Sequence, residues 1–240
     1  MSTKELRLLV LATVVHAAWL PDPGRAQGTF WNLDFESAQV APVPAGQDGG
    51  YVPTTDGLPG WAGFIGTNQL TQVLHNSFNL AVASISIMGP NSDSRYILQG
   101  QYSAILVDGR DPFGSGSAYA AASISQAGLV PADARSLRFR LGTSSTALSV
   151  SFAGSPLSYF LLGSTPNYNF FGADISPYAG QAGVLEFSAK PIPYPYTRAY
   201  LDGIVFSPSS IPEPDAFGLL LLGLAGLALK RPRRRQARLG

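Results

Sequence analysis

Short runs of strand-forming residues alternate with turn signals along most of this 240-residue chain. Gly, Pro, Asn, Asp and Ser mark turns at 89–92, 108–112, 153–156 and 164–167. The runs between such signals predict strands at 71–74, 84–87, 96–98, 103–106, 118–125, 136–142, 148–152, 158–162, 167–174, 183–188 and 199–206. One helical turn is expected at 175–180, with Ser176 as cap and Pro177 at the first helical position. Many short strands without helices predict two packed antiparallel sheets, an all-β sandwich, and a Greek-key order would make it a jelly roll.

The amino-terminal part of this body carries two further patterns. Residues 30–36 alternate apolar and polar side chains, which predicts an opening strand with Asn32 and Glu36 on one face and Trp31 on the other. Residues 41–60 hold four prolines and predict an irregular surface loop, after which extended structure resumes at 61–65. We expect Trp31 and Trp61 in the core.

The first 26 residues have the composition of a secretory signal peptide. Lys4 and Arg7 precede a largely apolar stretch at 8–20, and Gly24 and Ala26 are the small residues expected before a cleavage site. Signal peptidase is therefore expected to cut after Ala26. The domains predicted are a signal peptide at 1–26, a sandwich at 27–210 and a tail at 211–240.

The tail consists of a rigid tripeptide, an uncharged run and a basic cluster. As a helix, the fourteen uncharged residues of Ala216–Leu229 would rise about 21 Å, short of the roughly 30 Å hydrocarbon core. If the membrane segment is counted from Ile211 instead, it is long enough for a thin or temporary span. A buried C-terminal helix is the alternative. Five of the cations that follow are expected to stop the chain with its tail on the cytoplasmic side: Lys230, Arg231, Arg233, Arg234 and Arg235.

This three-part order resembles the sorting tail of the PEP-CTERM family of exported bacterial proteins. The resemblance rests on Pro212, Glu213 and Pro214, on the Leu- and Gly-rich run after them, and on the terminal arginines. It implies recognition in the inner membrane by an exosortase, a membrane-embedded cysteine protease or transpeptidase that cuts near the tripeptide. It also implies a Gram-negative host that makes extracellular polysaccharide, with a product sent to the cell surface or biofilm matrix.

The charge of the body excludes a nucleic-acid binder. Residues 28–210 contain seven Arg or Lys and eleven Asp or Glu, a formal charge of −4, although the whole chain is +1. A protein that displaces counterions from phosphates needs a basic folded face. With no cysteine in the chain, the stability of the body must come from packing or from a bound ion.

Catalytic groups are scarce. His75 is the one histidine after the signal segment, and without positioned partners it is expected to be structural. Asp108 and Asp111 are the one carboxylate pair that a glycoside hydrolase could use, but their Asp-Gly-Arg-Asp-Pro context favours a turn. We therefore expect a non-enzymatic protein, with a hydrolase as the least favoured alternative.

A second resemblance covers scattered parts of the body. It is similar to galactose-binding-like and carbohydrate-binding-module jelly rolls at 32–36, 58–61, 126–131, 137–139, 174–181, 185–187 and 201–204. That likeness implies a structural Ca²⁺ between Glu36 and Asp202, although Gly203 stands where such proteins often have a second Asp. Water-facing roles for both carboxylates are the alternative.

Tyr194 and Tyr196, in a proline-rich segment, are candidates for a sugar-stacking platform, with core packing or loop anchoring of the rings as the alternative. The expected function is thus an exported surface or matrix protein associated with exopolysaccharide, and a carbohydrate-binding module proper is the alternative.

Overall fold

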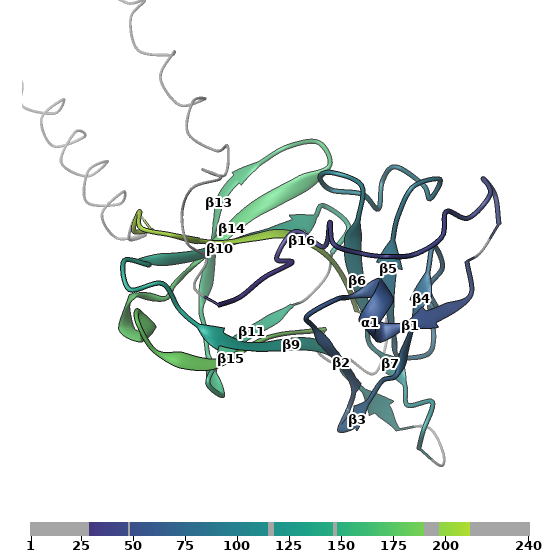
Figure 1. Cartoon of the computed structure of the whole chain (residues 1–240), viewed down its shortest axis with the longest axis horizontal. Coiled ribbons are helices and arrows are strands. Elements are labelled where there is room, and N and C mark those ends of the chain that lie inside the picture. Colours follow the sequence, from purple (N-terminus) through teal and green to yellow (C-terminus); the bar gives the residue numbers. More distant parts are fainter. Residues whose placement is uncertain (1–28, 48, 115–117, 146–147, 190–196, 212–240) are drawn as a thin grey trace, which may run out of the picture.

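The structure is a computed structural model that describes residues 29–47, 49–114, 118–145, 148–189 and 197–211. Strands dominate these ranges (Figure 1), and the helical elements are α1, Thr54–Gly57, and one 3₁₀ turn, η1, Ser176–Tyr178. The strands are β1 Tyr51–Pro53, β2 Ala62–Ile65, β3 Asn68–Gln69, β4 Gln72–His75, β5 Ser84–Met88, β6 Ser103–Val107, β7 Gly109–Arg110, β8 Tyr119–Ala120, β9 Ala122–Leu129, β10 Ser136–Gly142, β11 Ser149–Phe152, β12 Ser155–Pro156, β13 Tyr159–Ser164, β14 Tyr168–Asp174, β15 Ala182–Ala189 and β16 Arg198–Ser207.

Most strands belong to two sheets. The eight-stranded sheet has the order β1-β4-β5-β6-β16-β10-β14-β13, and the six-stranded sheet has the order β12-β11-β15-β9-β2-β3. Neighbours are antiparallel throughout both sheets except for the parallel pair β4 and β5. Strands β7 and β8 form a separate two-stranded ribbon. The chain ends its described part just after β16, a central strand of the larger sheet.

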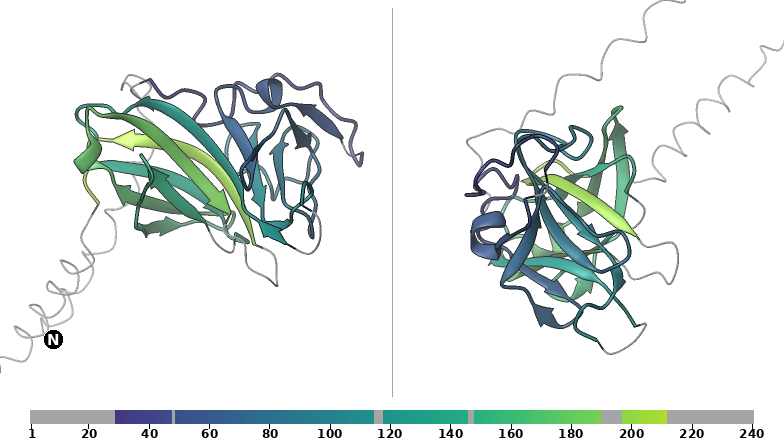
Figure 2. Two further views of the ribbon diagram at one scale, coloured as in Figure 1. Left: turned by 90° about the horizontal axis from the view of Figure 1, so that it is seen from below. Right: turned by 90° about the vertical axis from the view of Figure 1, so that its right-hand side faces the viewer.

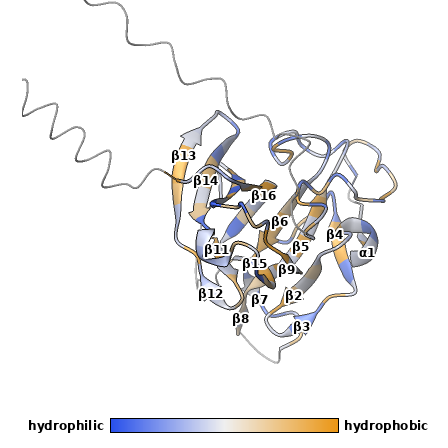
Figure 3. Cartoon of the chain, turned by 60° about the vertical axis from the view of Figure 1, so that its left-hand side comes forward, coloured by the Kyte–Doolittle hydropathy of each residue, from blue (hydrophilic) through white to orange (hydrophobic). Residues whose placement is uncertain are grey.

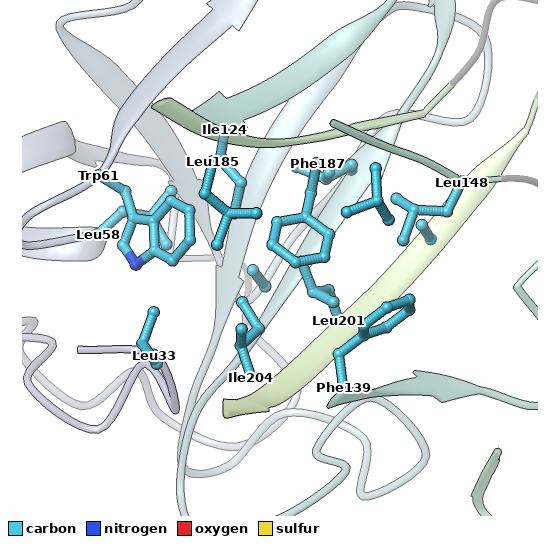
Figure 4. Packing of buried hydrophobic residues seen from close by; sticks show 14 of the residues in the cluster. Leu33, Leu58, Trp61, Ile124, Phe139, Leu148, Leu185, Phe187, Leu201 and Ile204 are labelled. Atoms are coloured by element: carbon cyan, nitrogen blue, oxygen red, sulfur yellow. The ribbon is translucent and has the colours of Figure 1, made fainter. Parts of the chain in front are cut away.

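The two sheets enclose one hydrophobic core, which Figure 4 shows from close by. Phe139 of β10 and Phe187 of β15 meet edge to face with ring centroids 5.5 Å apart, and Trp61 lies 6.3 Å from Phe187. Alternation along β10 explains which of its residues enter the core. Leu137, Phe139 and Leu141 point inward, while Arg138 and Arg140 lie on the opposite face of the sheet. The sheets are thus stacked layers, which Figure 2 shows from two further directions.

Several successive strands cross between the layers, whereas the pairs β11–β12 and β13–β14 each stay within one sheet. From β9 onward, β9, β11 and β15 lie in the six-stranded sheet, and β10, β14 and β16 lie in the eight-stranded sheet. Each crossing carries the chain over the end of the core. Strands that are distant in sequence therefore become neighbours, such as β6 and β16.

A second, smaller cluster covers the outer face of the eight-stranded sheet. Its buried members are Met88, Leu98, Ile105, Val107 and Tyr200. Because alternate residues of a strand point to opposite faces, β6 gives Leu106 to the main core and Ile105 to this cluster. This is why β6 is buried on both faces.

Most predicted strands are confirmed with small shifts of their ends, and so is the helical turn, at 176–178. The single strand predicted at 118–125 is instead two strands of different sheets, β8 and β9, and β9 continues to Leu129. The prediction is wrong for 96–98, which is not a strand, and incomplete for 41–60, which contains β1 and α1. It is also wrong for 30–36. There Asn32 and Phe35 have φ angles of 50° and 60°, so the segment folds into turns instead of an extended strand.

The two tryptophans have different environments. Trp61 is 5% exposed, as predicted, but Trp31 is 51% exposed, so its assignment to the core is wrong. The turns at 30–36 break the alternation on which that assignment depended. Phe30, Leu33 and Phe35 enter the core instead.

Within the described ranges, no helix is long and apolar enough to span a membrane. The run Ala216–Leu229, which was predicted to do so, lies outside those ranges, as does the predicted signal peptide.

Candidate functional site

The described body ends immediately before the sorting tripeptide. Pro212, Glu213 and Pro214 and the five predicted stop residues lie outside the described residues, but Ile211 lies within them. The carbonyl oxygen of Ser209 accepts hydrogen bonds from Ser136 Oγ at 2.8 Å and from Arg138 Nη2 at 3.3 Å. The residues that precede the tripeptide are therefore bonded to β10.

Apolar contacts continue this attachment. A side chain added at Gly172 of β14 would meet Leu162 at 2.8 Å and Ile211 at 3.4 Å, so both residues lie over this glycine on the outer face of the sheet. The sequence alone did not predict a role for Ser136, Arg138 or Gly172. The sequence does place Arg138 on the outer face, because it stands beside Phe139 in a predicted strand and neighbouring side chains of a strand alternate in direction.

Glu36 binds a loop of the larger sheet. Its Oε1 accepts hydrogen bonds from the backbone N–H groups of Gln101 at 2.8 Å and Tyr102 at 3.1 Å. Gly100, with φ of 64°, passes so close to this carboxylate that a methyl group there would collide with it. Glu36 therefore attaches the irregular amino-terminal segment to the loop before β6.

Asp202 binds the same loop from β16. Its Oδ2 accepts hydrogen bonds from the backbone N–H of Gln99 and from Ser103 Oγ, both at 2.9 Å, and its Oδ1 accepts one from the N–H of Gly203 at 2.5 Å. The residue is 1% exposed. Burial raises the pKa of Asp202 to about 7, against the lowering effect of these hydrogen bonds and of the Arg140 charge.

Arg140 lies beside Asp202 on the neighbouring strand. The two residues are opposite each other in the pairing of β10 and β16, and Gly203 leaves space that the Arg140 guanidinium fills. That group lies over the rings of Tyr168 and Phe170, 5.5 and 5.1 Å from their centroids. Gly203 therefore makes room for the buried Arg140 side chain.

The contacts of Glu36 and Asp202 bear on the calcium prediction. Calcium takes six to eight oxygen ligands, many of them carboxylate oxygens. Here three carboxylate oxygens accept N–H or O–H donors, which a metal ion would have to displace. Among the described residues, no group of three or more acidic, His or Cys side chains is placed to hold a metal. As arranged, the pair fits the binding of a loop better than the binding of Ca²⁺.

The remaining polar candidates have structural contacts. Asp108 is fully buried, and its Oδ1 accepts a hydrogen bond from the N–H of Thr197 at the start of β16. Asp111 accepts a hydrogen bond from the N–H of Phe113 at 2.9 Å, which is the turn contact expected from the sequence. Tyr194 and Tyr196 lie outside the described residues.

His75 is the last residue of β4 and is 2% exposed. Burial lowers its pKa. Its Nε2 is buried without a hydrogen-bond partner among the described atoms. An imidazole this deeply buried has almost no surface for a substrate to reach.

Comparison with known proteins supports the interpretation of the tail. Residues 210–235 match the PEP-CTERM protein-sorting motif, which is the recognition signal for exosortase processing. No curated protein has a sequence that matches the chain. Among solved structures, the chain is similar to the crystal structure of the enzymatically active domain of bacteriophage CBA120 tailspike protein 4. The identity is 14% and the TM-score 0.34, over 62% of this chain and 19% of that one, which demonstrates neither a shared fold nor a shared activity.

Proposed function

We propose that the chain is an exported, non-enzymatic protein of the cell surface or biofilm matrix, sorted and cleaved by an exosortase and associated with exopolysaccharide. The observation that carries this proposal is the sorting motif at 210–235, which begins where the described body ends. After signal peptidase acts, the tail holds the protein briefly in the inner membrane of a Gram-negative cell. Exosortase cleavage then releases the body to the outside.

The body that is delivered is a jelly roll. In that fold, two four-stranded sheets are built from strands that alternate between them. The order β6-β16-β10-β14 facing β12-β11-β15-β9 supports this interpretation, with the other strands of the two sheets added at the edges. Such a domain suits adhesion or matrix structure, although the fold alone does not fix the function.

The structural bonds of the acidic candidates support a non-enzymatic role. A glycoside hydrolase needs two accessible carboxyl groups on either side of a sugar bond. Asp108 is enclosed and bonded to Thr197, and Asp111 stabilises its own turn. A hydrolase is thus the least favoured function, and loss of polysaccharide cleavage in Asp108→Asn without loss of folding would reverse that order.

The sorting proposal is tested in a host that carries an exosortase. The full chain is expressed beside a variant that lacks residues 212–240, and each is followed by cell fractionation and by intact-mass measurement. We expect the full chain at the surface with a mass that lacks both Met1–Ala26 and most of the tail. Equal surface retention of the truncated variant, or a mature mass that still includes residues 230–240, would contradict the proposal.

A carbohydrate-binding module is the second candidate, on one specific observation. The segment that contains Tyr194 and Tyr196 ends at Thr197, whose backbone is bonded to the buried Asp108 in both directions. A fixed residue directly after the two tyrosines supports a role for them in sugar stacking. Affinity electrophoresis in polysaccharide gels should show weaker retardation for Tyr194→Ala and Tyr196→Ala, with Tyr51→Ala as the control because Tyr51 is 64% exposed on β1.

A further inference from the structure

Strand β13 forms an uncharged, apolar edge of the eight-stranded sheet. Its sequence is Tyr-Phe-Leu-Leu-Gly-Ser, and Figure 3 shows much of it in the orange of hydrophobic residues. Phe160 is 44% exposed and Leu161 is 57% exposed. Natural proteins usually protect a sheet edge with charges, proline or a covering segment. Neither a charge nor a proline is present in β13, and although a bulge hinders strand pairing there, it leaves these apolar side chains exposed.

The start of the tail lies against this edge. Ile211 and Leu162 share the space over Gly172, and Phe160 is opposite Gly172 in the pairing of β13 and β14. Directly opposed residues of antiparallel strands face the same side of the sheet. Leu161 is opposite Phe171 and so faces the other side of the same edge. We use the name β13 patch for Phe160, Leu161, Leu162 and Ile211, which surround this edge strand.

The length of the intervening chain limits how far the β13 patch can be from the membrane. Four residues, Pro212 to Asp215, separate Ile211 from the apolar run Ala216–Leu229. Five fully extended residues cover at most about 18 Å. While the apolar run is inserted, Ile211 is therefore held within about 18 Å of the hydrocarbon boundary, and the headgroup region occupies about 5–7 Å of that distance.

We infer that the β13 patch contacts the outer leaflet of the inner membrane while the tail is inserted, so that the body lies on the lipid surface before cleavage. This inference rests on the membrane span in the proposed function. A lipid surface fits better than strand addition by a second copy, because β13 has a bulge between Leu161 and Gly163 that disturbs the regular ladder of the edge. Apolar side chains at such a surface enter the boundary by about 5–10 Å.

Site-specific quenching tests the contact in the full-length chain, which has no native cysteine. Leu161→Cys and Tyr51→Cys are each labelled with an environment-sensitive fluorophore and reconstituted into vesicles whose lipids carry nitroxide groups. The positions are 57% and 64% exposed and lie on opposite edges of the same sheet. We expect quenching at position 161 to exceed that at position 51 by at least about threefold, because only the β13 patch reaches the lipid boundary.

A second substitution tests the apolar origin of the contact. Phe160→Ser is added to the labelled Leu161→Cys chain, with Phe113→Ser as its control because Phe113 is 57% exposed outside β13. Quenching at position 161 should fall by about half or more with Phe160→Ser, since the contact with lipid loses a large apolar side chain. It should not change with Phe113→Ser.

Three outcomes would overturn the inference, and they differ from one another. Vesicles that float with the protein but leave the label at position 161 unquenched refute the lipid contact and leave the membrane span intact. A label that is shielded from water, is not quenched by lipid and becomes exposed on dilution identifies a second copy as the partner. A chain that does not float with vesicles overturns the membrane span itself and the inference with it.

Discussion

Glu36 and Asp202 come from opposite ends of the body and bind one loop, residues 99–103. Glu36 accepts hydrogen bonds from Gln101 and Tyr102, and Asp202 accepts them from Gln99 and Ser103. The bonds of Asp202 are shielded from water, because this residue is 1% exposed. The amino-terminal segment, the loop before β6 and the last strand are therefore joined at one point. We call this set of contacts the carboxylate clasp, defined by Glu36, Asp202 and residues 99–103.

Gly100 provides a direct test of the carboxylate clasp. Gly100→Ala should destabilise the protein more than Gly154→Ala, because both glycines have positive φ but only the first lies against a carboxylate. The left-handed backbone alone should cost about 1–2 kcal/mol at each site. Displacing Glu36 should add about 1–3 kcal/mol at Gly100. Urea unfolding of the two variants measures the difference, and equal losses would count against a close contact with Glu36.

The raised pKa of Asp202 predicts a pH-dependent stability. Its pKa is about 7 in the folded state, against an ordinary value of 3.8. Between about pH 4 and 7 the folded protein holds a proton that the unfolded chain has released, so the free energy of unfolding should fall as pH rises and level off above about 7. The total contribution is on the order of a few kcal/mol, because a difference of one in pKa between the folded and unfolded states corresponds to about 1.4 kcal/mol.

Asp202→Asn isolates this contribution, because the amide has nearly the same shape but does not titrate. Urea unfolding of both proteins across this pH range should give a steeper decline for the wild type. The other ionisable groups are common to both proteins, so their effects cancel in the difference. Parallel curves would show that Asp202 titrates near its ordinary value.

Calcium dependence separates the carboxylate clasp from a metal site. Since the oxygens of Glu36 and Asp202 already accept N–H and O–H donors, we expect the same melting temperature in excess Ca²⁺ and in excess chelator. A structural Ca²⁺ would instead raise the melting temperature through its binding free energy. A rise with Ca²⁺ that disappears in Glu36→Gln would restore the calcium interpretation.

At the scale of elements, local patterns predicted the central strands well. β10, β14, β15 and β16 lie within one residue of their predicted ends, because alternation and turn residues agree there. The segment at 30–36 also alternates, yet it forms turns. Hydrogen bonds from Asn32 to Pro59 and from Ser37 to Asn32 hold it there. The first bond joins residues 27 positions apart and the second joins residues 5 positions apart, and no short sequence window shows the more distant partner.

The pairing of the sheets predicts which positions of β15 matter for stability. Phe187→Ala should cost about 3–5 kcal/mol, since the ring is fully buried between Trp61 and Phe139. Val184→Ala, three positions away on the outer face and 44% exposed, should change the free energy of unfolding by less than about 0.5 kcal/mol. Denaturant titrations of both variants check this, and similar losses would mean that the inner face of β15 is assigned wrongly.

At the scale of the whole molecule, the strand order and the candidate contacts could not be predicted. Nothing in the sequence of β16 indicates that it lies between β6 and β10, because the crossings between sheets are decided by the packing of the complete core. The same packing brings Glu36 and Asp202 to one loop and places Ile211 over Gly172. The tail was predictable because its signal depends on the order of residues in a short stretch, which the match at 210–235 confirms.

The distribution of charge makes the tail the part of the chain that sets orientation. The body is formally −4, and six of the sixteen Lys and Arg residues lie in the last eleven positions. Cations resist transfer across the membrane and hold the end of a span on the cytoplasmic side. Because the apolar run is short, we expect this cluster, and not the hydrophobicity of the run, to stop export.

Replacing the cluster by glutamine tests this dependence. We expect the variant with glutamine at positions 230, 231, 233, 234 and 235 to pass through the membrane and accumulate outside the cell with its tail uncleaved, because each cation contributes to retention. The control replaces the four arginines Arg231, Arg233, Arg234 and Arg235 by lysine, which keeps the charge and should keep processing. Intact-mass measurement of the cell-associated and released protein distinguishes the two forms. Normal cleavage of the glutamine variant would show that the apolar run alone holds the tail long enough for the exosortase to act.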